Sequence, residues 1–188
     1  MWNKIKKSWD NKRSKGCCGM YSAIDIARYI IKYCSEQYLD VSNLRLQKLL
    51  YFVQAFFLVE EEKGYGYPAF SDRIEAWYFG PVVPNAYKEF KRYGGINIPH
   101  LNEYLTSDPT NHWNIKKEKY NDSIISEHDK KGIETMVDYF KDWATNDLVK
   151  LTHAQQPWID AYNPEEKNHN NEITQNSIKE YFLNDELQ

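Results

Sequence analysis

The segment from Leu44 to Leu58 constrains the fold most, because apolar residues occur almost all the way round the helix that its spacing predicts. Leucine, valine and phenylalanine recur there at intervals of three and four residues, which is the period of an α-helix. A helix that is apolar on nearly every side is unsuited to a surface, so we predict a central, largely buried helix. It should begin after Ser42 and end near Glu62–Gly64. Its widest apolar face comprises Leu46, Leu49, Leu50, Val53, Phe56 and Phe57.

Amphipathic helices are predicted before and after this segment. One covers Ser22–Gln37, where apolar residues recur at helical spacing. Ser22 is a good N-cap and Asp25 follows three residues later, a variant of the capping box. Ser126 and Asp129 repeat that spacing before another apolar stripe. Further helices are predicted from about Pro84 to Gly94-Gly95, and over Asn146–His153, Gln155–Tyr162 and Thr174–Asn184.

Only one segment is clearly β-favouring. Ile74–Phe79 is short and rich in aromatic residues, and Gly80-Pro81 is expected to end it. Residues 106–111 are polar and predict a loop, while Trp113–Ile115 is a candidate to pair with Ile74–Phe79. Trp143 is expected to continue the buried apolar stripe of the helix that starts after residue 126. The predicted fold is therefore mainly α, a single compact helical domain with room for a small β ribbon.

Charge is unevenly distributed along the 188 residues, whose net charge is −3. Residues 1–19 hold six basic residues and one acidic residue, a net of +5, and the rest of the chain has a net of −8. We predict a basic N-terminal extension over residues 1–20 and one domain over residues 21–188, with Met20 a candidate natural start. A domain at −8 does not suit generic phosphate binding, so nucleic acid is not an expected partner of the domain itself.

The cysteines and the hydropathy pattern favour a cytoplasmic protein. An odd number of cysteines, two of them adjacent, makes no disulfide framework, and no C-x-x-C or H-x-x-x-H spacing suggests zinc. Reduced thiols are typical of the cytoplasm. The sequence has no apolar run of about 18 residues, so we predict no membrane span. We also predict no metal and no cofactor. The three cysteines are Cys17, Cys18 and Cys34.

No catalytic motif is visible, and we predict that the protein is not an enzyme. None of the five histidines stands in a recognisable metal or nucleophile motif, and no phosphate-binding P-loop occurs. His153 leaves two interpretations open. It either orders the turn that contains Pro157 and Trp158, or it lies at a helix end where the dipole is negative.

Trp77-Tyr78-Phe79 is the clearest candidate surface for a protein partner. Strand residues alternate between faces, so Trp77 and Tyr78 cannot both point into the core. Aromatic residues are frequent anchors of interfaces. The alternative is burial on both sides between helices. The candidate partner-binding residues are Trp77, Tyr78, Phe79, Pro81 and Val82.

Four blocks of sequence occur together in a characteristic order: SAIDIARYIIKYC from residue 22, LRLQKLLYFVQAFFL from residue 44, EAWYFGPVVPNAYKEFKRYG from residue 75 and LTHAQQPWIDAY from residue 151. In this order they resemble the Panacea antitoxin domain, the SocA-like family that includes phage-associated GepA proteins. The resemblance covers about Tyr21 to Phe182. Positions that recur in the family fall here on Gln47, Lys48, Leu49, Tyr51, Trp77, Gly80, Pro81, Val82, Tyr87, His153, Pro157 and Trp158.

The resemblance implies an antitoxin that neutralises a cognate toxin, encoded by the adjacent gene, through direct protein–protein binding. A second hypothesis is an adaptor that delivers the toxin to a ClpXP-type protease. A third is a small-ligand binder or enzyme, with a pocket lined by Gln47, Tyr78 and His153. The family supplies no catalytic residues. It implies an architectural role for Gln47, Lys48, Leu49, Tyr51, Gly80, His153, Pro157 and Trp158.

Overall fold

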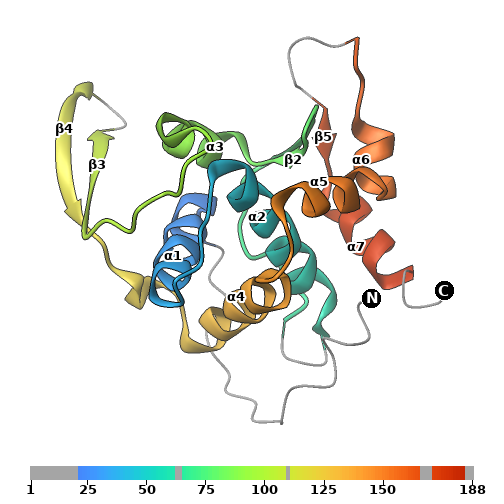
Figure 1. Cartoon of the computed structure of the whole chain (residues 1–188), viewed down its shortest axis with the longest axis horizontal. Coiled ribbons are helices and arrows are strands. Elements are labelled where there is room, and N and C mark those ends of the chain that lie inside the picture. The colour runs from blue at the N-terminus through green and yellow to red at the C-terminus, as the bar shows by residue number, and fades with distance from the viewer. Residues whose placement is uncertain (1–20, 62–64, 109–110, 166–170, 185–188) are drawn as a thin grey trace.

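The computed structural model of the chain describes residues 21–61, 65–108, 111–165 and 171–184 (Figure 1). Within these residues the fold is mainly α, as predicted. The predicted extension over residues 1–20 lies outside the described residues, as do residues 62–64, where the central helix was expected to end. The elements are α1 (Ala23–Glu36), α2 (Asn43–Val59), β1 (Ile74–Trp77), β2 (Gly80–Val82), α3 (Pro84–Phe90), η4 (Lys91–Tyr93), β3 (Glu103–Asp108), β4 (Asn111–Lys119), η5 (Asp122–Ile124), α4 (Glu127–Phe140), α5 (Thr145–His153), α6 (Gln156–Ala161), β5 (Glu172–Ile173) and α7 (Gln175–Asn184).

Helix α2 lies at the centre of the molecule, with the other helices around it (Figure 1). Every residue of α2 except Leu44 is buried, which confirms the predicted central helix. Phe52 stacks against Phe140 of α4 with 4.4 Å between ring centroids, and Tyr51 lies 6.1 Å from Phe182 of α7. Aromatic contacts of this kind join α2 to the helices on two of its sides.

The predicted N-caps are confirmed at both helices where an acidic residue follows the serine. The Oγ of Ser22 accepts a hydrogen bond from the backbone N–H of Asp25 at 3.1 Å, and Ser126 does the same for Asp129 at 3.1 Å. These bonds satisfy donors that a helix N-terminus otherwise leaves without a partner. The short polar residue before each apolar stripe therefore sets where the helix begins.

The β1 strand ends at Trp77, and the next strand begins at Gly80. The expectation that Gly80-Pro81 only terminates a strand was wrong, because these residues open β2, which pairs antiparallel with β1. The three-stranded sheet has the order β2-β1-β5, so β2 is an edge strand. An edge position accepts proline because its missing N–H has no neighbour to bond on the open side. Two-residue β5 is too short to leave a sequence pattern.

A second ribbon, β3–β4, projects from the helical body (Figure 1). Two expectations were wrong here. Most of residues 106–111 belongs to these strands rather than to a loop, and Ile115 pairs with Ser107 of β3 rather than with the segment at Ile74–Phe79. The polar residues of β4 lack the alternation that marks a half-buried strand, since the ribbon stands away from the core.

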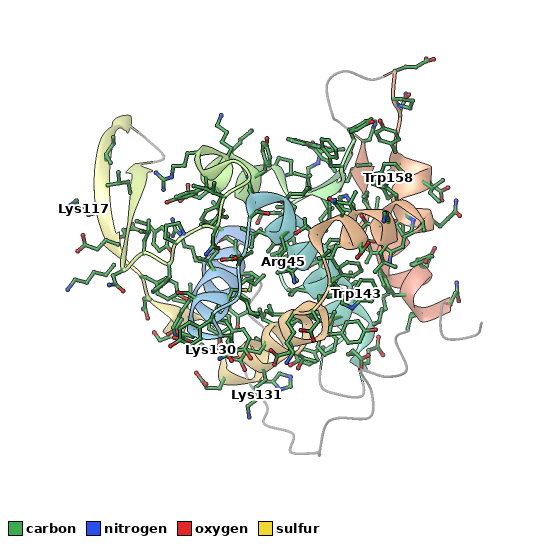
Figure 2. The ribbon with its side chains drawn as sticks, in the orientation of Figure 1. Arg45, Lys117, Lys130, Lys131, Trp143 and Trp158 are labelled. Carbon is green, nitrogen blue, oxygen red and sulfur yellow. The ribbon has the colours of Figure 1, made fainter. Side chains whose placement is uncertain are left out.

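Helix α4 ends at Phe140, before Trp143. Trp143 nevertheless continues the buried stripe as expected, because it packs edge-on against Phe140 with ring centroids 5.6 Å apart. Arg45 of α2 reaches this end of α4 (Figure 2), where its guanidinium donates to the carbonyls of Phe140 and Trp143 at 2.6 Å and to that of Lys141 at 3.3 Å. One buried side chain thus satisfies the carbonyls that a helix C-terminus leaves free.

We expect Arg45→Lys to destabilise the fold by about 2 kcal/mol, because a single ammonium cannot reproduce the guanidinium fork that holds these carbonyls. Urea denaturation of both proteins measures the change. Lys150→Arg, on the exposed face of α5, is the matched control and should change the unfolding free energy by less than about 0.5 kcal/mol. Equal losses in the two variants would show that Arg45 does not cap α4.

Candidate functional site

Lys48 is a fully buried lysine of α2 that lies beneath the β1–β2 hairpin. Its ammonium donates a hydrogen bond to the carbonyl of Pro81 at 2.9 Å. Burial in an apolar interior disfavours the charged form, and it lowers the pKa of Lys48 to about 7. A family position that looked only architectural therefore carries a group that can change its charge near neutral pH.

The lowered pKa predicts how stability depends on pH. Between pH 7 and the ordinary pKa of lysine, the unfolded chain binds a proton that the folded chain does not, so stability should rise with pH. We expect Lys48→Met to remove this dependence, which is at most about 1.4 kcal/mol per pH unit. Urea unfolding of both proteins at several pH values from about 6.5 to 8.5 measures it. Parallel pH curves would show that Lys48 keeps an ordinary pKa.

Gly80 lies where the hairpin, α2 and α5 approach one another. Its φ is +94°, a conformation that side chains rarely adopt. A Cβ at this position would come within 2.7 Å of both the Lys48 ammonium and the Thr152 hydroxyl. Both the backbone conformation and the lack of space therefore require glycine here.

Gln47 connects the other end of the hairpin to α2. Its Oε1 accepts a hydrogen bond from the backbone N–H of Val83 at 2.9 Å, and its Nε2 donates to Asn43 at 3.0 Å. Asn43 in turn donates to the carbonyl of Tyr87 in α3 at 3.2 Å. Gln47 and Lys48, consecutive residues of α2, thus bind the backbone of β2 at Pro81 and of Val83 at the start of α3.

His153, Trp158 and Tyr162 form a stack of rings beside the hairpin. The centroids of His153 and Trp158 are 4.1 Å apart, and those of Trp158 and Tyr162 are 4.5 Å apart. Trp158 (Figure 2) also donates from Nε1 to the carbonyl of Trp77 at 3.0 Å. The pKa of His153 is lowered, first by burial and then by nearby Lys48, while a hydrogen bond with the backbone of Tyr78 opposes the shift. His153 is the last residue of α5, and its ring also contacts Trp158 of the following turn, so features of both interpretations are present.

We expect Trp158→Ala to destabilise the fold by about 3 kcal/mol, because it removes two ring contacts and the hydrogen bond to the hairpin. The value lies at the lower end for aromatic-to-alanine changes, since Trp158 is only partly buried. Trp158→Phe keeps stacking but loses the hydrogen bond, and we expect it to lose about 1–2 kcal/mol. A loss below about 1 kcal/mol for alanine in denaturant melts would contradict this role.

Tyr78 and Phe79 form the turn between β1 and β2, and both side chains are exposed. Tyr78 is 67% exposed and Phe79 is 58% exposed, and their rings meet edge-on with centroids 4.9 Å apart. We call these two residues the aromatic turn. The other partner-binding candidates are less accessible, since Trp77 is half-buried and both Pro81 and Val82 are buried.

Three residues that take part in the site, Asn43, Thr152 and Gln155, belong to no recognisable sequence motif of their own. Asn43 and Thr152 are buried against the hairpin network, and Gln155 is buried in the corner between α5 and α6. The Nε2 of His153 and the Oε1 of Gln155 find no hydrogen-bond partner within the described part of the chain. Buried polar atoms without a partner are uncommon in folded proteins. Only the proximity of Thr152 and Gln155 to His153 in the sequence could have drawn attention to them.

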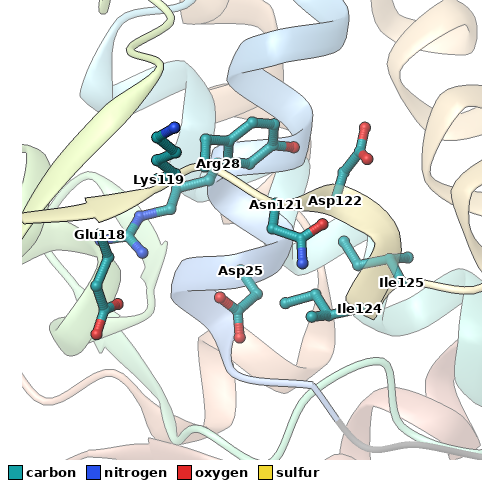
Figure 3. Close-up of a pocket in the computed structure, with 9 residues that line it drawn as sticks. Asp25, Arg28, Glu118, Lys119, Asn121, Asp122, Ile124 and Ile125 are labelled. Carbon is teal, nitrogen blue, oxygen red and sulfur yellow. The ribbon is translucent and has the colours of Figure 1, made fainter.

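A pocket opens elsewhere, between α1, the end of β4 and η5 (Figure 3). Its lining includes Asp25, Arg28 and Asp122, and so mixes both charges. Asp122 already accepts a hydrogen bond from Lys32 at 2.6 Å, which lowers its pKa, and Arg28 bonds Glu89 at 3.2 Å. Because these charges are engaged, we assign no ligand here. The residues proposed to line a small-ligand pocket, Gln47, Tyr78 and His153, are not part of it.

Among the described residues, no cluster of three or more histidine, cysteine or acidic side chains could hold a metal ion. Within the same residues, no helix is long and apolar enough to cross a membrane. The arrangement around the hairpin is suited to presenting exposed rings on a fixed backbone.

The match to a known family covers most of this arrangement. Residues 46–159, more than half of the chain, match the family described as "Antitoxin SocA-like, Panacea domain". The chain belongs to the SocA-like Panacea family. The match includes most of α2, the hairpin, and His153 and Trp158 of the ring stack. It is narrower than the extent of the resemblance expected from Tyr21 to Phe182.

One curated Panacea relative is Antitoxin SocA of Caulobacter vibrioides (strain NA1000 / CB15N). It is 32% identical over 134 residues, which cover 71% of this chain and 66% of that protein. The chain thus spans just under two thirds of the length of this relative. No solved structure gives a significant match.

Proposed function

We propose that this Panacea protein is an antitoxin that binds a cognate toxin directly, with the aromatic turn at the centre of the contact. Membership of a family named for an antitoxin, and 32% identity to Antitoxin SocA, support the antitoxin role. The observation that supports the place of contact is the pair of exposed rings, Tyr78 and Phe79, at the tip of the hairpin. Aromatic anchors of this kind dominate the energy of many interfaces.

The support beneath the turn favours binding because it fixes the backbone before the partner arrives. Pro81 is held by Lys48, Val83 by Gln47 and Trp77 by Trp158, each through one backbone hydrogen bond. A loop that is already ordered loses less conformational entropy when it binds. The rings can therefore contribute most of their contact energy to affinity.

The charge of the chain indicates what kind of partner it suits. The chain outside residues 1–19 has a net charge of −8, which favours a toxin with a basic surface, because complementary potentials accelerate encounter. We propose that this toxin is encoded by the adjacent gene. The proposal requires no cofactor and no catalytic group, and it locates the protein in the cytoplasm beside its toxin.

Co-expression with the product of the adjacent gene tests this function. The neighbour alone should arrest growth, the pair should restore it, and a stoichiometric complex should co-purify. A neighbour that is not toxic, or one that the protein neither rescues nor binds, would contradict the proposal.

The half-life of the toxin in cells separates direct blocking from delivery to a ClpXP-type protease. Direct blocking predicts the same toxin half-life with and without this protein, and the same rescue in a strain that lacks the protease. Faster turnover of the toxin, together with loss of rescue in that strain, would establish the adaptor mechanism instead.

A further inference from the structure

The β3–β4 ribbon offers an unpaired strand edge. The two strands form a sheet of their own, and no third strand joins it within the described ranges. In Figure 1, β4 lies on the far side of β3 from the helices, so its outer edge faces away from the body. An exposed edge is a template on which an extended segment of another chain can add as a further strand.

The side chains of β4 give this edge a local excess of positive charge. Lys116, Lys117 and Lys119 are exposed and lie within four consecutive residues that include one acid, Glu118. Figure 2 shows Lys117 on the projecting ribbon, far from the helices. The basic charge belongs to β4 alone, because β3 carries the acids Glu103 and Asp108, and Glu103 lies 3.9 Å from the Lys117 ammonium.

One face of the ribbon also carries two exposed apolar side chains. Leu105 is 55% exposed and Ile115 is 63% exposed. Leu105 pairs with Lys117, two residues from Ile115, so both apolar side chains lie on the same face as Lys117. Exposed apolar and basic residues side by side along an open edge can provide both specificity and attraction for an incoming strand.

We propose that the outer edge of β4 binds an acidic, extended segment of a partner protein as a third antiparallel strand. Its carboxylates would lie opposite the three lysines, and an aliphatic residue would lie opposite Ile115. This contact is separate from the aromatic turn and does not depend on what binds there. A second copy of β4 fits poorly, because an antiparallel copy centred anywhere from residue 116 to residue 118 sets at least one lysine opposite another.

A synthetic peptide tests the proposal with the full chain. In antiparallel register, the peptide TETEEVTVT sets glutamates opposite Lys116, Lys117 and Lys119 and a valine opposite Ile115. Labelled peptide should bind with a dissociation constant below about 1 mM by fluorescence anisotropy. Hydrogen exchange should show new protection of the β4 amides when peptide is present. A peptide with N-methyl groups at alternate positions on its pairing edge should bind at least about tenfold more weakly.

Charge variants supply the matched control. Lys117→Glu should weaken peptide binding about fivefold, whereas Lys131→Glu, the same charge change on an exposed residue of α4 (Figure 2), should change it less than about twofold. Absence of saturable binding, equal binding of the N-methylated peptide, or equal effects of both variants would overturn the proposal. Tighter binding of a mixed-sequence single-stranded oligonucleotide than of the peptide would assign the ribbon to nucleic acid instead.

Discussion

Replacing Gly80 with alanine should cost at least about 3 kcal/mol of unfolding free energy. The positive φ of Gly80 accounts for about 1–2 kcal/mol of this loss, because an alanine is strained in that conformation. The rest comes from crowding, since the new Cβ would lie within 2.7 Å of the Lys48 ammonium and the Thr152 hydroxyl. Neither group can move away easily, because both residues are fully buried. Urea denaturation with a fitted midpoint and slope measures the loss.

Gly94 provides the control for the backbone contribution. Its φ is also positive, at +55°, but a Cβ there would meet no atom within 4 Å. We expect Gly94→Ala to lose only about 1–2 kcal/mol, so that the difference between the two variants reports the crowding at the hairpin. If both variants lose the same amount, Lys48 and Thr152 do not pack against Gly80 as described.

The sequence was most informative where a pattern is local. The apolar run of α2 predicted its central position, and Ser22 and Ser126 predicted where two helices begin, because helix periodicity and capping depend on residues a few positions apart. Sequence was least informative at the β-ribbons. Gly80 and Pro81 usually interrupt a strand, and only their edge position, which depends on how the sheet is assembled, makes them compatible with β2.

In the candidate site too, local sequence patterns are informative and contacts between distant segments are not visible. Its family positions could be named from sequence, but their roles depend on contacts between segments far apart in the chain. Lys48 has a lowered pKa only because the hairpin and α5 cover it, and Pro81 is buried although a surface position was expected. Arg45 carries no local signal at all, and the only signal at Thr152 is its place next to His153. Tertiary packing, rather than any motif, decides which aromatic residues of Trp77-Tyr78-Phe79 face solvent.

Replacing both rings of the aromatic turn with alanine should weaken toxin binding by about 100-fold or more. Truncation of one aromatic anchor commonly costs about 2 kcal/mol of binding free energy, and a factor of ten corresponds to about 1.4 kcal/mol. Stability should change by less than about 1 kcal/mol, because Tyr78 and Phe79 are mostly exposed and the hydrogen bonds beneath them use other residues.

Tyr38→Ala is the matched control, since it removes an aromatic side chain that is 97% exposed on the loop between α1 and α2. This variant should bind the toxin as the unmodified protein does. Growth rescue should follow the same order, with the double variant failing to neutralise the toxin at expression levels where the control still does.

The most direct measurement is therefore the dissociation constant of the complex with the adjacent-gene toxin, by isothermal titration calorimetry, for the unmodified protein, Tyr78→Ala/Phe79→Ala and Tyr38→Ala. The account predicts a loss of about 100-fold or more for the double variant alone, with its unfolding free energy nearly unchanged. A double variant that is folded and binds the toxin as tightly as the unmodified protein would contradict the claim that the aromatic turn holds the toxin.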